Sequence, residues 1–377
     1  MRPEISDVSG VDPFSLGLRV LHVYQPVEAG VPRYANAAAE FQAARGWTVH
    51  MANPEPVGSL DVQEHQWRAN RNPLKGVRSE SQALAQLLKD IQPDVIVAHS
   101  AKAGMIVRGT VRGRIPTVFV PHAWSHLALP GPAKPVAIAW ERLAARWTNA
   151  VVAVGAAEAS EGVRRHVRAP MFLVRNPVPP RWHLATAQDR AAAREALDLP
   201  QAAPIVTCVG RFSRQKGQDS LIDAWRLVSK ELPEARLLLV GDGPTGDDLR
   251  KGAPDTVIFT GATDDPRPFL AACDVAALPS RWEGLSLSML EAMASGRSVV
   301  TTAVAGSEVV ADSDCGAVVP VDDPQAFAQA LLPRLAGLIH ADVEGRLGHQ
   351  YVIDHHDFDT QMARFAAVIS RAHAFGR

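Results

Sequence analysis

Short apolar runs alternate with stretches in which apolar residues recur at helical spacing, and this alternation continues along most of the chain. The apolar runs predict twelve strands, at 18–24, 47–52, 94–100, 116–120, 150–155, 171–175, 204–210, 235–241, 256–260, 274–279, 298–302 and 316–320. In the first half, a period near 3.6 residues predicts helices at 31–45, 79–91 and 135–148. Continuous apolar strands that alternate with helices are typical of parallel sheets covered on both faces.

The length of 377 residues favours two domains rather than one. A proline-rich segment at 176–188 interrupts the alternation and is the natural linker. We therefore expect an α/β fold with two doubly wound, Rossmann-like domains, residues 1–180 and 181–354, facing a cleft. The amphipathic pattern at 358–375 predicts a last helix, and we expect residues 355–377 to return to the first domain. Ligands of such folds bind at the carboxyl ends of strands, which places the expected site in the cleft.

Composition narrows the class of protein. With 47% hydrophobic and 21% charged residues, the chain resembles a soluble globular protein, and its three cysteines, without metal-ligand spacing, are expected to be buried thiols. The first residues have no apolar signal-peptide core, so we expect a cytoplasmic protein. No stripe of basic and aromatic residues is present and the pI is about 6.9, which argues against nucleic acid as a partner.

The net charge of −1 conceals an uneven distribution along the chain. Residues 1–180 carry 20 Lys and Arg against 14 Asp and Glu, whereas residues 181–377 carry 19 against 26. An excess of cations in the first half is expected of a surface that meets an anionic partner, such as the inner face of a membrane or a lipid phosphate. Uneven but solvated surface charge is the alternative explanation.

The segment from Pro279 to Gly296, PSRWEGLSLSMLEAMASG, carries the most informative chemistry. It follows a predicted strand, places Glu283 in a loop, and places Glu291 in the helix that comes next. Free N–H groups at the start of a helix bind phosphate, and carboxylates accept hydrogen bonds from hydroxyl groups. This combination favours a ligand that is both anionic and polyhydroxylated, as a nucleotide sugar is.

A second strand-to-helix loop, GRFSRQKGQDS at 210–220, carries two cations. Arg211 and Lys216 stand between glycines, where a guanidinium and an ammonium group can converge on a diphosphate. Two unrelated surface cations are the alternative interpretation.

Together these motifs resemble the nucleotide-sugar half of the family 4 glycosyltransferases, which are retaining enzymes of GT-B fold. The resemblance rests on GRFSRQKG, LLLVGDGP, PSRWEGLSLSMLEAMASG and TAVAGSEVV, in that order. It continues upstream, more weakly, in the segment Gly30–Tyr34, in Pro121-His122 and in Arg175-Asn176-Pro177-Val178. It implies transfer of a sugar from a UDP- or GDP-sugar to a glycan or lipid-linked acceptor in cell-envelope, exopolysaccharide or glycolipid biosynthesis.

The resemblance also implies roles for individual residues. Arg211 and Lys216 would bind the donor diphosphate, Glu291 would accept the ribose hydroxyls, and the catalytic Glu283 would contact the donor sugar. The backbone N–H groups that would hold the distal phosphate or the sugar belong to Gly284, Leu285 and Ser286.

In the first half, the resemblance makes His122 the second catalytic candidate, beside the sugar. The loop that begins at Gly30 would cover the phosphates, and Arg33, Tyr34 and His99 are candidates for the acceptor side. A purely structural histidine is the alternative for His122. A metal site at His122 and His126 lacks a third ligand nearby.

Glycosyl transfer develops positive charge on the sugar while a diphosphate departs. No metal-binding pair of the DxD type stands in a suitable loop, since Asp264-Asp265 and Asp322-Asp323 precede prolines and are typical of turns or helix starts. We therefore expect no metal and no cofactor, with cations and helix N–H groups stabilising the leaving group.

Three other functions fit these residues less well. The match Gly241-Asp242-Gly243-Pro244-Thr245-Gly246 to the dinucleotide fingerprint opens the second strand–helix unit of its domain rather than the first, which argues against nicotinamide or flavin binding. A nucleotide-sugar epimerase of the same architecture would need acids and bases at another carbon of the sugar. A non-catalytic sugar-nucleotide sensor would not need the pair Glu283 and His122.

Overall fold

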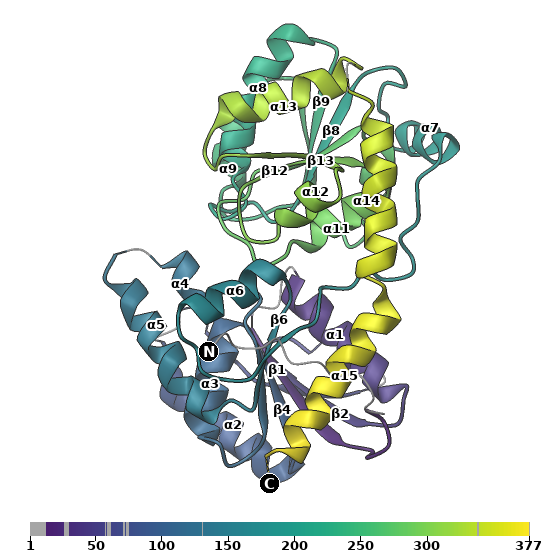
Figure 1. The fold of residues 1–377 in the computed structure, drawn as a ribbon. Coiled ribbons are helices and arrows are strands. Elements are labelled where there is room, and N and C mark those ends of the chain that lie inside the picture. Colours follow the sequence, from purple (N-terminus) through teal and green to yellow (C-terminus); the bar gives the residue numbers. More distant parts are fainter. Residues whose placement is uncertain are drawn as a thin grey trace. The chain divides into compact units, whose positions relative to one another are not determined.

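Two parallel β-sheets organise the chain (Figure 1). The structure is a computed structural model that describes residues 13–25, 30–56, 58, 62–70, 72, 75–129, 131–337 and 339–376. The chain divides into two compact units: unit 1 comprises Met1–Pro177 and Asp359–Arg377, and unit 2 comprises Val178–Phe358. The expected α/β class with two doubly wound sheets is confirmed, and the C-terminal helix belongs to unit 1, as expected.

The sheet of unit 1 has seven parallel strands in the order β3-β2-β1-β4-β5-β6-β7. Their bounds are β1 Arg19–Tyr24, β2 Thr48–Asn53, β3 Gln63–Gln66, β4 Val95–His99, β5 Thr117–Val120, β6 Ala150–Ala153 and β7 Met171–Leu173. The helices of this part of the chain are α1 Gly30–Ala43, α2 Val77–Ile91, α3 Ser100–Val111, α4 Ser125–Ala128, α5 Ala133–Ala144, the 3₁₀ turn η1 Ala145–Trp147, α6 Ala156–Arg164 and α15 Phe358–Ala374.

The sheet of unit 2 has six parallel strands in the order β10-β9-β8-β11-β12-β13. Their bounds are β8 Ile205–Val209, β9 Arg236–Val240, β10 Val257–Gly261, β11 Val275–Leu278, β12 Ser298–Thr302 and β13 Gly316–Val319. The helices are α7 Ala187–Ala196, α8 Gln218–Glu231, α9 Gly246–Gly252, α10 Arg267–Ala272, α11 Leu287–Ala294, α12 Glu308–Asp312, α13 Pro324–Leu335 and α14 Ala341–His355.

The two faces of the sheet in unit 1 differ in polarity. Because side chains alternate along a strand, Leu21 and Val23 of β1 pack into an apolar cluster with residues of α2 and α3. The alternate residue, His22, faces α1 and α15 and lies against the ring of Phe365. Figure 1 shows α15 in yellow beside this sheet. One face is therefore an ordinary apolar core, and the other holds buried polar groups.

All twelve predicted strands are present, but the structure also contains elements that the hydrophobic pattern did not predict. Strand β3, Gln-Glu-His-Gln, lies at the edge of its sheet, where partial exposure tolerates polar residues. The segment Gly30–Tyr34 is the first turn of α1 rather than the expected loop. Pro32 fits there because the first turn of a helix has no intrahelical acceptor for its N–H groups.

Each sheet reverses its strand order at one point, between β1 and β4 in unit 1 and between β8 and β11 in unit 2. Open α/β sheets bind ligands beyond the carboxyl ends of strands at such a switch point. The loops that follow these four strands are therefore the places to look for chemistry in each unit.

Candidate active site

In unit 2, the loop after β8 is fitted closely to the loop after β11. Gly217, which precedes α8, has a φ of +67°, a backbone conformation that favours glycine. A Cβ atom at this position would lie 2.1 Å from the carbonyl oxygen of Pro279, which directly follows β11. The two loops can approach this closely only because residue 217 has no side chain.

This approach brings Lys216 and Glu283 into a direct ion pair. The Lys216 Nζ atom lies 2.5 Å from Oε1 of Glu283, and the two side chains are 19% and 11% exposed. The Ser280 hydroxyl donates to the same Oε1 atom at 2.8 Å. The sequence predicted both charged residues for the site but not their contact with each other. With both bonds on Oε1, the Oε2 atom of Glu283 is the oxygen available to a ligand.

Further hydrogen bonds hold the two loops in register. The Gln215 side chain donates to the Trp282 carbonyl at 3.0 Å, and the Arg281 N–H group donates to the Gln215 carbonyl at 2.7 Å. The Arg281 guanidinium forms two bonds, of 2.9 and 2.8 Å, with the Asp219 carboxylate at the start of α8 and a third, of 2.8 Å, with Asp322. The Lys216–Glu283 pair therefore sits on a rigid support, as a preorganised site requires.

The N-terminus of α11 opens directly after this pair. Ser286 precedes the helix, and its hydroxyl is buried without a hydrogen-bond partner among the described residues. Gly284 and Leu285 are buried, and a Cβ atom at Gly306 would lie 3.0 Å from the Gly284 carbonyl oxygen. Glu291, one turn into the helix, is 4% exposed. Free N–H groups, a hydroxyl and two carboxylates thus lie on one short segment, which suits an anionic and hydroxylated ligand.

Arg211 lies in the same loop as Lys216 and is half-buried. Its carbonyl oxygen accepts a hydrogen bond of 3.1 Å from the Gln218 side chain, which fixes the backbone of the loop. The diphosphate-binding roles of Arg211 and Lys216, the ribose-binding role of Glu291 and the phosphate contacts of residues 284–286 remain predictions.

In unit 1, His122 stands on a strained turn after β5. Its φ is +53° and that of Ala123 is +114°, values that side-chain-bearing residues rarely adopt. Glu158 of α6 holds the turn, because its carboxylate accepts from the Ala123 N–H group at 2.7 Å and from the Val154 N–H group at 2.8 Å. Burial raises the pKa of Glu158 to about 7 despite these bonds. A strained turn held by a buried carboxylate places the imidazole of His122 firmly.

His99 ends β4 next to this turn and is fully buried. Its Nδ1 atom lies 3.1 Å from Nε2 of His122, and its Nε2 atom lies 2.9 Å from Nδ1 of His22. The Tyr34 ring packs edge-on against His122 and His99, with centroid distances of 5.0 and 5.9 Å. The acceptor-side roles predicted for His99 and Tyr34 stay predictions, and the structure adds that both residues pack against His122.

Gly30 begins α1 and is half-buried, whereas Arg33 is exposed one turn later. Their predicted roles, on the donor phosphates and on the acceptor, also stay predictions. The residues 26–29 that precede Gly30 lie outside the part of the chain that the structure describes.

Acidification should destabilise unit 1 through the buried histidines. Burial lowers the pKa of His22 from 6.5 to about 4. Because the pKa in the folded state lies below the unfolded value, the stabilisation is present above pH 6.5 and is lost as the pH falls toward 4. At pH 5 this loss amounts to about 2 kcal/mol for His22 alone. Urea unfolding of the wild type and of His22→Asn at pH 7 and pH 5 checks this: the variant should lose less stability on acidification, and equal losses would contradict the assignment.

Several residues of the site escaped sequence analysis. Ser280 and Gln215 lie inside the motifs that were singled out, so their polarity was the available signal. His22 interrupts the apolar run LRVLHVY, which marks it as a polar group inside a sheet. Nothing in the sequence marks Glu158 as part of the site, because its role depends on hydrogen bonds to residues of two separate loops.

Comparison with known proteins finds glycosyltransferase family models that match each part of the chain. The family model described as Glycosyltransferase Family 4 matches residues 29–182, and the model described as Glycosyl transferases group 1 matches residues 203–336.

Curated relatives carry related names. The lipopolysaccharide core biosynthesis glycosyltransferase LpsE of Rhizobium meliloti is 37% identical over 179 residues, which cover 44% of this chain and 52% of LpsE. The GDP-mannose-dependent alpha-(1-6)-phosphatidylinositol monomannoside mannosyltransferase of Mycolicibacterium smegmatis is 34% identical over 196 residues, covering 48% of this chain and 51% of that protein. The matched region thus spans about half the length of these relatives.

Solved structures agree on the fold. Anabaena HepE in complex with UDP and glucose superimposes with a TM-score of 0.79 at 20% identity, covering 93% of this chain and 98% of HepE. Sucrose-phosphate synthase from Thermosynechococcus elongatus gives 0.79 at 21% identity, covering 92% and 97%. The two doubly wound sheets are those of the GT-B glycosyltransferase fold. The chain thus matches glycosyltransferase family models in both of its parts, that of family 4 over residues 29–182 and that of group 1 over residues 203–336.

Proposed function

We propose that this chain is a retaining glycosyltransferase that transfers a sugar from a UDP- or GDP-sugar to a glycan or lipid-linked acceptor. The observation that carries the proposal is the Lys216–Glu283 pair, which two loops at the switch point of unit 2 bring to the N-terminus of α11. The relatives' names place them in lipopolysaccharide core and phosphatidylinositol mannoside synthesis, which supports an envelope glycan or glycolipid as the product.

In the proposed mechanism, Lys216 and Arg211 bind the diphosphate of the donor. The bond between the anomeric carbon and the phosphate oxygen breaks, and the two cations and the N–H groups of α11 stabilise the negative charge that develops on the phosphate. The acceptor hydroxyl attacks from the same face, its oxygen bonds to the anomeric carbon, and its proton passes to the leaving phosphate. Glu283 acts as an orienting group through Oε2, which accepts from a sugar hydroxyl, and His122 binds a hydroxyl from unit 1.

We also propose that Arg211 and Lys216, rather than a metal ion or a cofactor, neutralise the charge of the leaving group. Lys216 already stabilises a negative charge at this place, because its ammonium group pairs with the carboxylate of Glu283. EDTA should then leave the rate of transfer unchanged, whereas loss of activity that Mg²⁺ or Mn²⁺ restores would overturn this part of the proposal.

A thermal-shift panel of UDP-, GDP- and ADP-sugars tests the donor class, because a ligand that binds only the folded state raises the melting temperature. One nucleoside should stabilise the protein more than the others, with the matching free diphosphate retaining most of the effect. If no nucleotide raises the melting temperature at millimolar concentration, the proposed function is wrong. If a nucleotide sugar stabilises the protein but is not turned over, a sensor is favoured instead. If the donor sugar is converted into an isomer, an epimerase is favoured.

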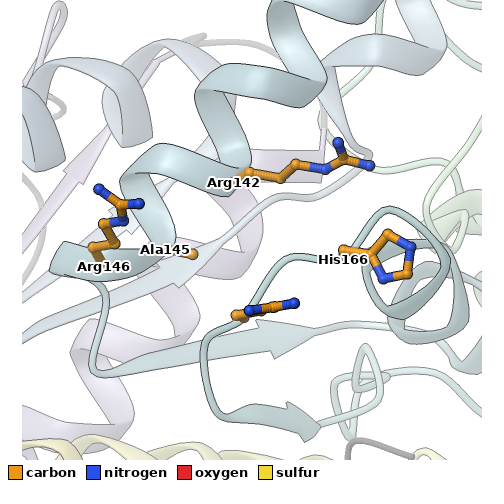
Figure 2. Close-up of a pocket in the computed structure, with 5 residues that line it drawn as sticks. Arg142, Ala145, Arg146 and His166 are labelled. Atoms are coloured by element: carbon orange, nitrogen blue, oxygen red, sulfur yellow. The ribbon is translucent and has the colours of Figure 1, made fainter.

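Unit 1 carries a basic hollow that we propose as the contact with an anionic membrane. The hollow, of about 440 Å³, is lined by Arg142, Ala145, Arg146, His166 and Arg168 (Figure 2). Its three arginines are exposed, and helix α5, which carries Arg142, also exposes Val136 (69%) and Leu143 (41%). Exposed apolar side chains beside arginines suit the interface of an anionic bilayer. Among the described residues, no helix is long and apolar enough to cross a membrane.

Vesicle sedimentation tests the membrane proposal. At low salt the wild type should sediment with vesicles that contain an anionic phospholipid and not with neutral vesicles. The variant Arg142→Ala/Arg146→Ala/Arg168→Ala should lose at least tenfold in partitioning, since each basic residue contributes about 1 kcal/mol at such a surface. Arg346→Ala, which removes an exposed arginine of unit 2, serves as the control. Equal sedimentation with both kinds of vesicle would overturn the proposal.

A further inference from the structure

A continuous chain of hydrogen bonds runs through unit 1 and ends at His122. The Nε2 atom of His22 lies 2.9 Å from Oε1 of Gln42, a residue of α1. The Nδ1 atom of His22 lies 2.9 Å from Nε2 of His99, and Nδ1 of His99 lies 3.1 Å from Nε2 of His122. One amide and three imidazoles are thus joined end to end, from α1 through β1 and β4 to the turn after β5.

Three of the four members of this chain are fully shielded from water, and His122 is half-buried. His22, His99 and Gln42 are all 0% exposed. The imidazoles stack almost in parallel, with interplanar angles of 17° between His22 and His99 and 22° between His99 and His122. Phe365 of α15 lies edge-on to both His22 and His99. Burial lowers the pKa of all three histidines, that of His22 to about 4 and that of His122 to about 3. All three rings are therefore neutral near pH 7.

When neutral imidazoles are joined in this way, all of the hydrogen bonds between them must point in the same direction from donor to acceptor. A neutral imidazole has one N–H donor and one bare nitrogen that accepts. If one ring donates through Nε2, its Nδ1 atom must accept from the next ring, and that ring must also donate through Nε2. The end of the chain decides the direction, and there Oε1 of Gln42 can only accept. His22, His99 and His122 thus all carry the proton on Nε2, and Nδ1 of His122 bears a lone pair.

We propose that Gln42, His22 and His99 are positioning residues that fix the tautomer of His122, so that its Nδ1 atom accepts a hydrogen bond from a substrate hydroxyl. The role of His122 beside the substrate rests on the proposed function, whereas the tautomer does not. Among the described residues, Nδ1 of His122 has no hydrogen-bond partner. The Tyr34 ring packs edge-on against His122, and the turn held by Glu158 fixes the backbone, so the ring cannot easily reverse.

The tautomer can be measured directly on the whole chain with ¹⁵N-labelled histidine. Long-range ¹H–¹⁵N correlation spectra distinguish a protonated Nε2 from a protonated Nδ1, and both from the charged ring. At pH 7, with His22→Asn, His99→Asn and His122→Asn used to assign the signals, three neutral rings protonated on Nε2 are expected in the wild type. A proton on Nδ1 of His122, or a charged His22 or His99, would overturn the proposal whether or not the chain transfers sugar.

The variant Gln42→Leu removes the acceptor that sets the direction and keeps a side chain of similar volume. We expect the Nδ1-protonated form of His122 to appear in its spectrum, and kcat to fall about tenfold, the loss of roughly one hydrogen bond. The Kd of the nucleotide should not change, since Arg211, Lys216 and Glu291, the side chains proposed to bind it, belong to unit 2. Gln86→Leu, at an exposed position of α2, is the matched control.

Two results of this comparison would count against a positioning role. A changed tautomer with an unchanged kcat would show that the tautomer does not matter for the reaction. An unchanged tautomer in a folded Gln42→Leu protein would show that Gln42 does not set the direction. If the wild type transfers no sugar, the proposed function fails by itself, and the spectra still decide the tautomer.

Discussion

Replacing Lys216 by methionine should lower the affinity for a nucleoside diphosphate roughly a hundredfold. A hydrogen bond to a charged group is worth up to about 3 kcal/mol, and each 1.4 kcal/mol corresponds to a factor of ten. The loss also leaves the carboxylate of Glu283, which is 11% exposed, without its cation and close to the phosphates. Calorimetric titration with the nucleotide that the donor panel selects measures the effect.

Lys251→Met is the matched control for this substitution. Lys251 belongs to the same unit, its side chain is 76% exposed, and that of its partner Asp248 is 83% exposed. Surface pairs of this kind contribute at most about 1 kcal/mol, so affinity and melting temperature should stay near those of the wild type. Equal nucleotide affinities in Lys216→Met, Lys251→Met and the wild type would show that the diphosphate does not bind beside Lys216.

Replacing Glu283 by glutamine should lower kcat by two orders of magnitude or more and leave the donor bound. A group that faces the charge of a transition state typically raises the rate by a factor of roughly 10² to 10³. Glu283 would face the positive charge that develops on the sugar. Lys216 loses its competing carboxylate in this variant, so the Kd of the nucleotide should stay the same or decrease. Single-turnover rates and calorimetry together separate the two effects.

The control is Glu231→Gln, at an exposed position near the end of α8. A Glu283→Gln enzyme with unchanged kcat and a weakened Kd would make this residue a donor-binding group only. Loss of the folded state would appear as a lower melting temperature. We expect no such loss, because the Oε1 atom of glutamine can still accept the hydrogen bond that Ser280 donates to Glu283.

Hydrophobic patterning was sufficient to predict the two sheets, because the strands other than β3 are short, mostly apolar runs of three to six residues. It failed at β3, where the strand lies at a sheet edge and all four side chains are polar. It also did not predict α3, whose stretch Ser100–Val111 contains two glycines and follows β4 without a turn. The local hydrophobic pattern thus predicts the strands that form the core. Edge strands, and helices that follow a strand directly, depend on the surrounding structure.

The candidate site was predictable in its residue types but not in its contacts. Arg211, Lys216, Glu283 and Glu291 stand out because charged residues border apolar strands at glycine-rich loops. The ion pair between Lys216 and Glu283 depends on how closely two loops approach, and no pattern within either loop encodes that distance. The histidine chain likewise joins β1, β4 and β5, whose order in the sheet is a property of topology.

The most direct test of the central claim is acceptor-dependent release of nucleoside diphosphate from the selected donor. A membrane extract that supplies lipid-linked glycan can serve as the acceptor, with the wild type compared against Arg211→Ala/Lys216→Ala. We predict release that requires the acceptor, a glycosylated product with the donor's anomeric configuration, and no release by the double variant. Equal release by the double variant, or a product of inverted configuration, would contradict the account of this site as the centre of a retaining glycosyltransferase.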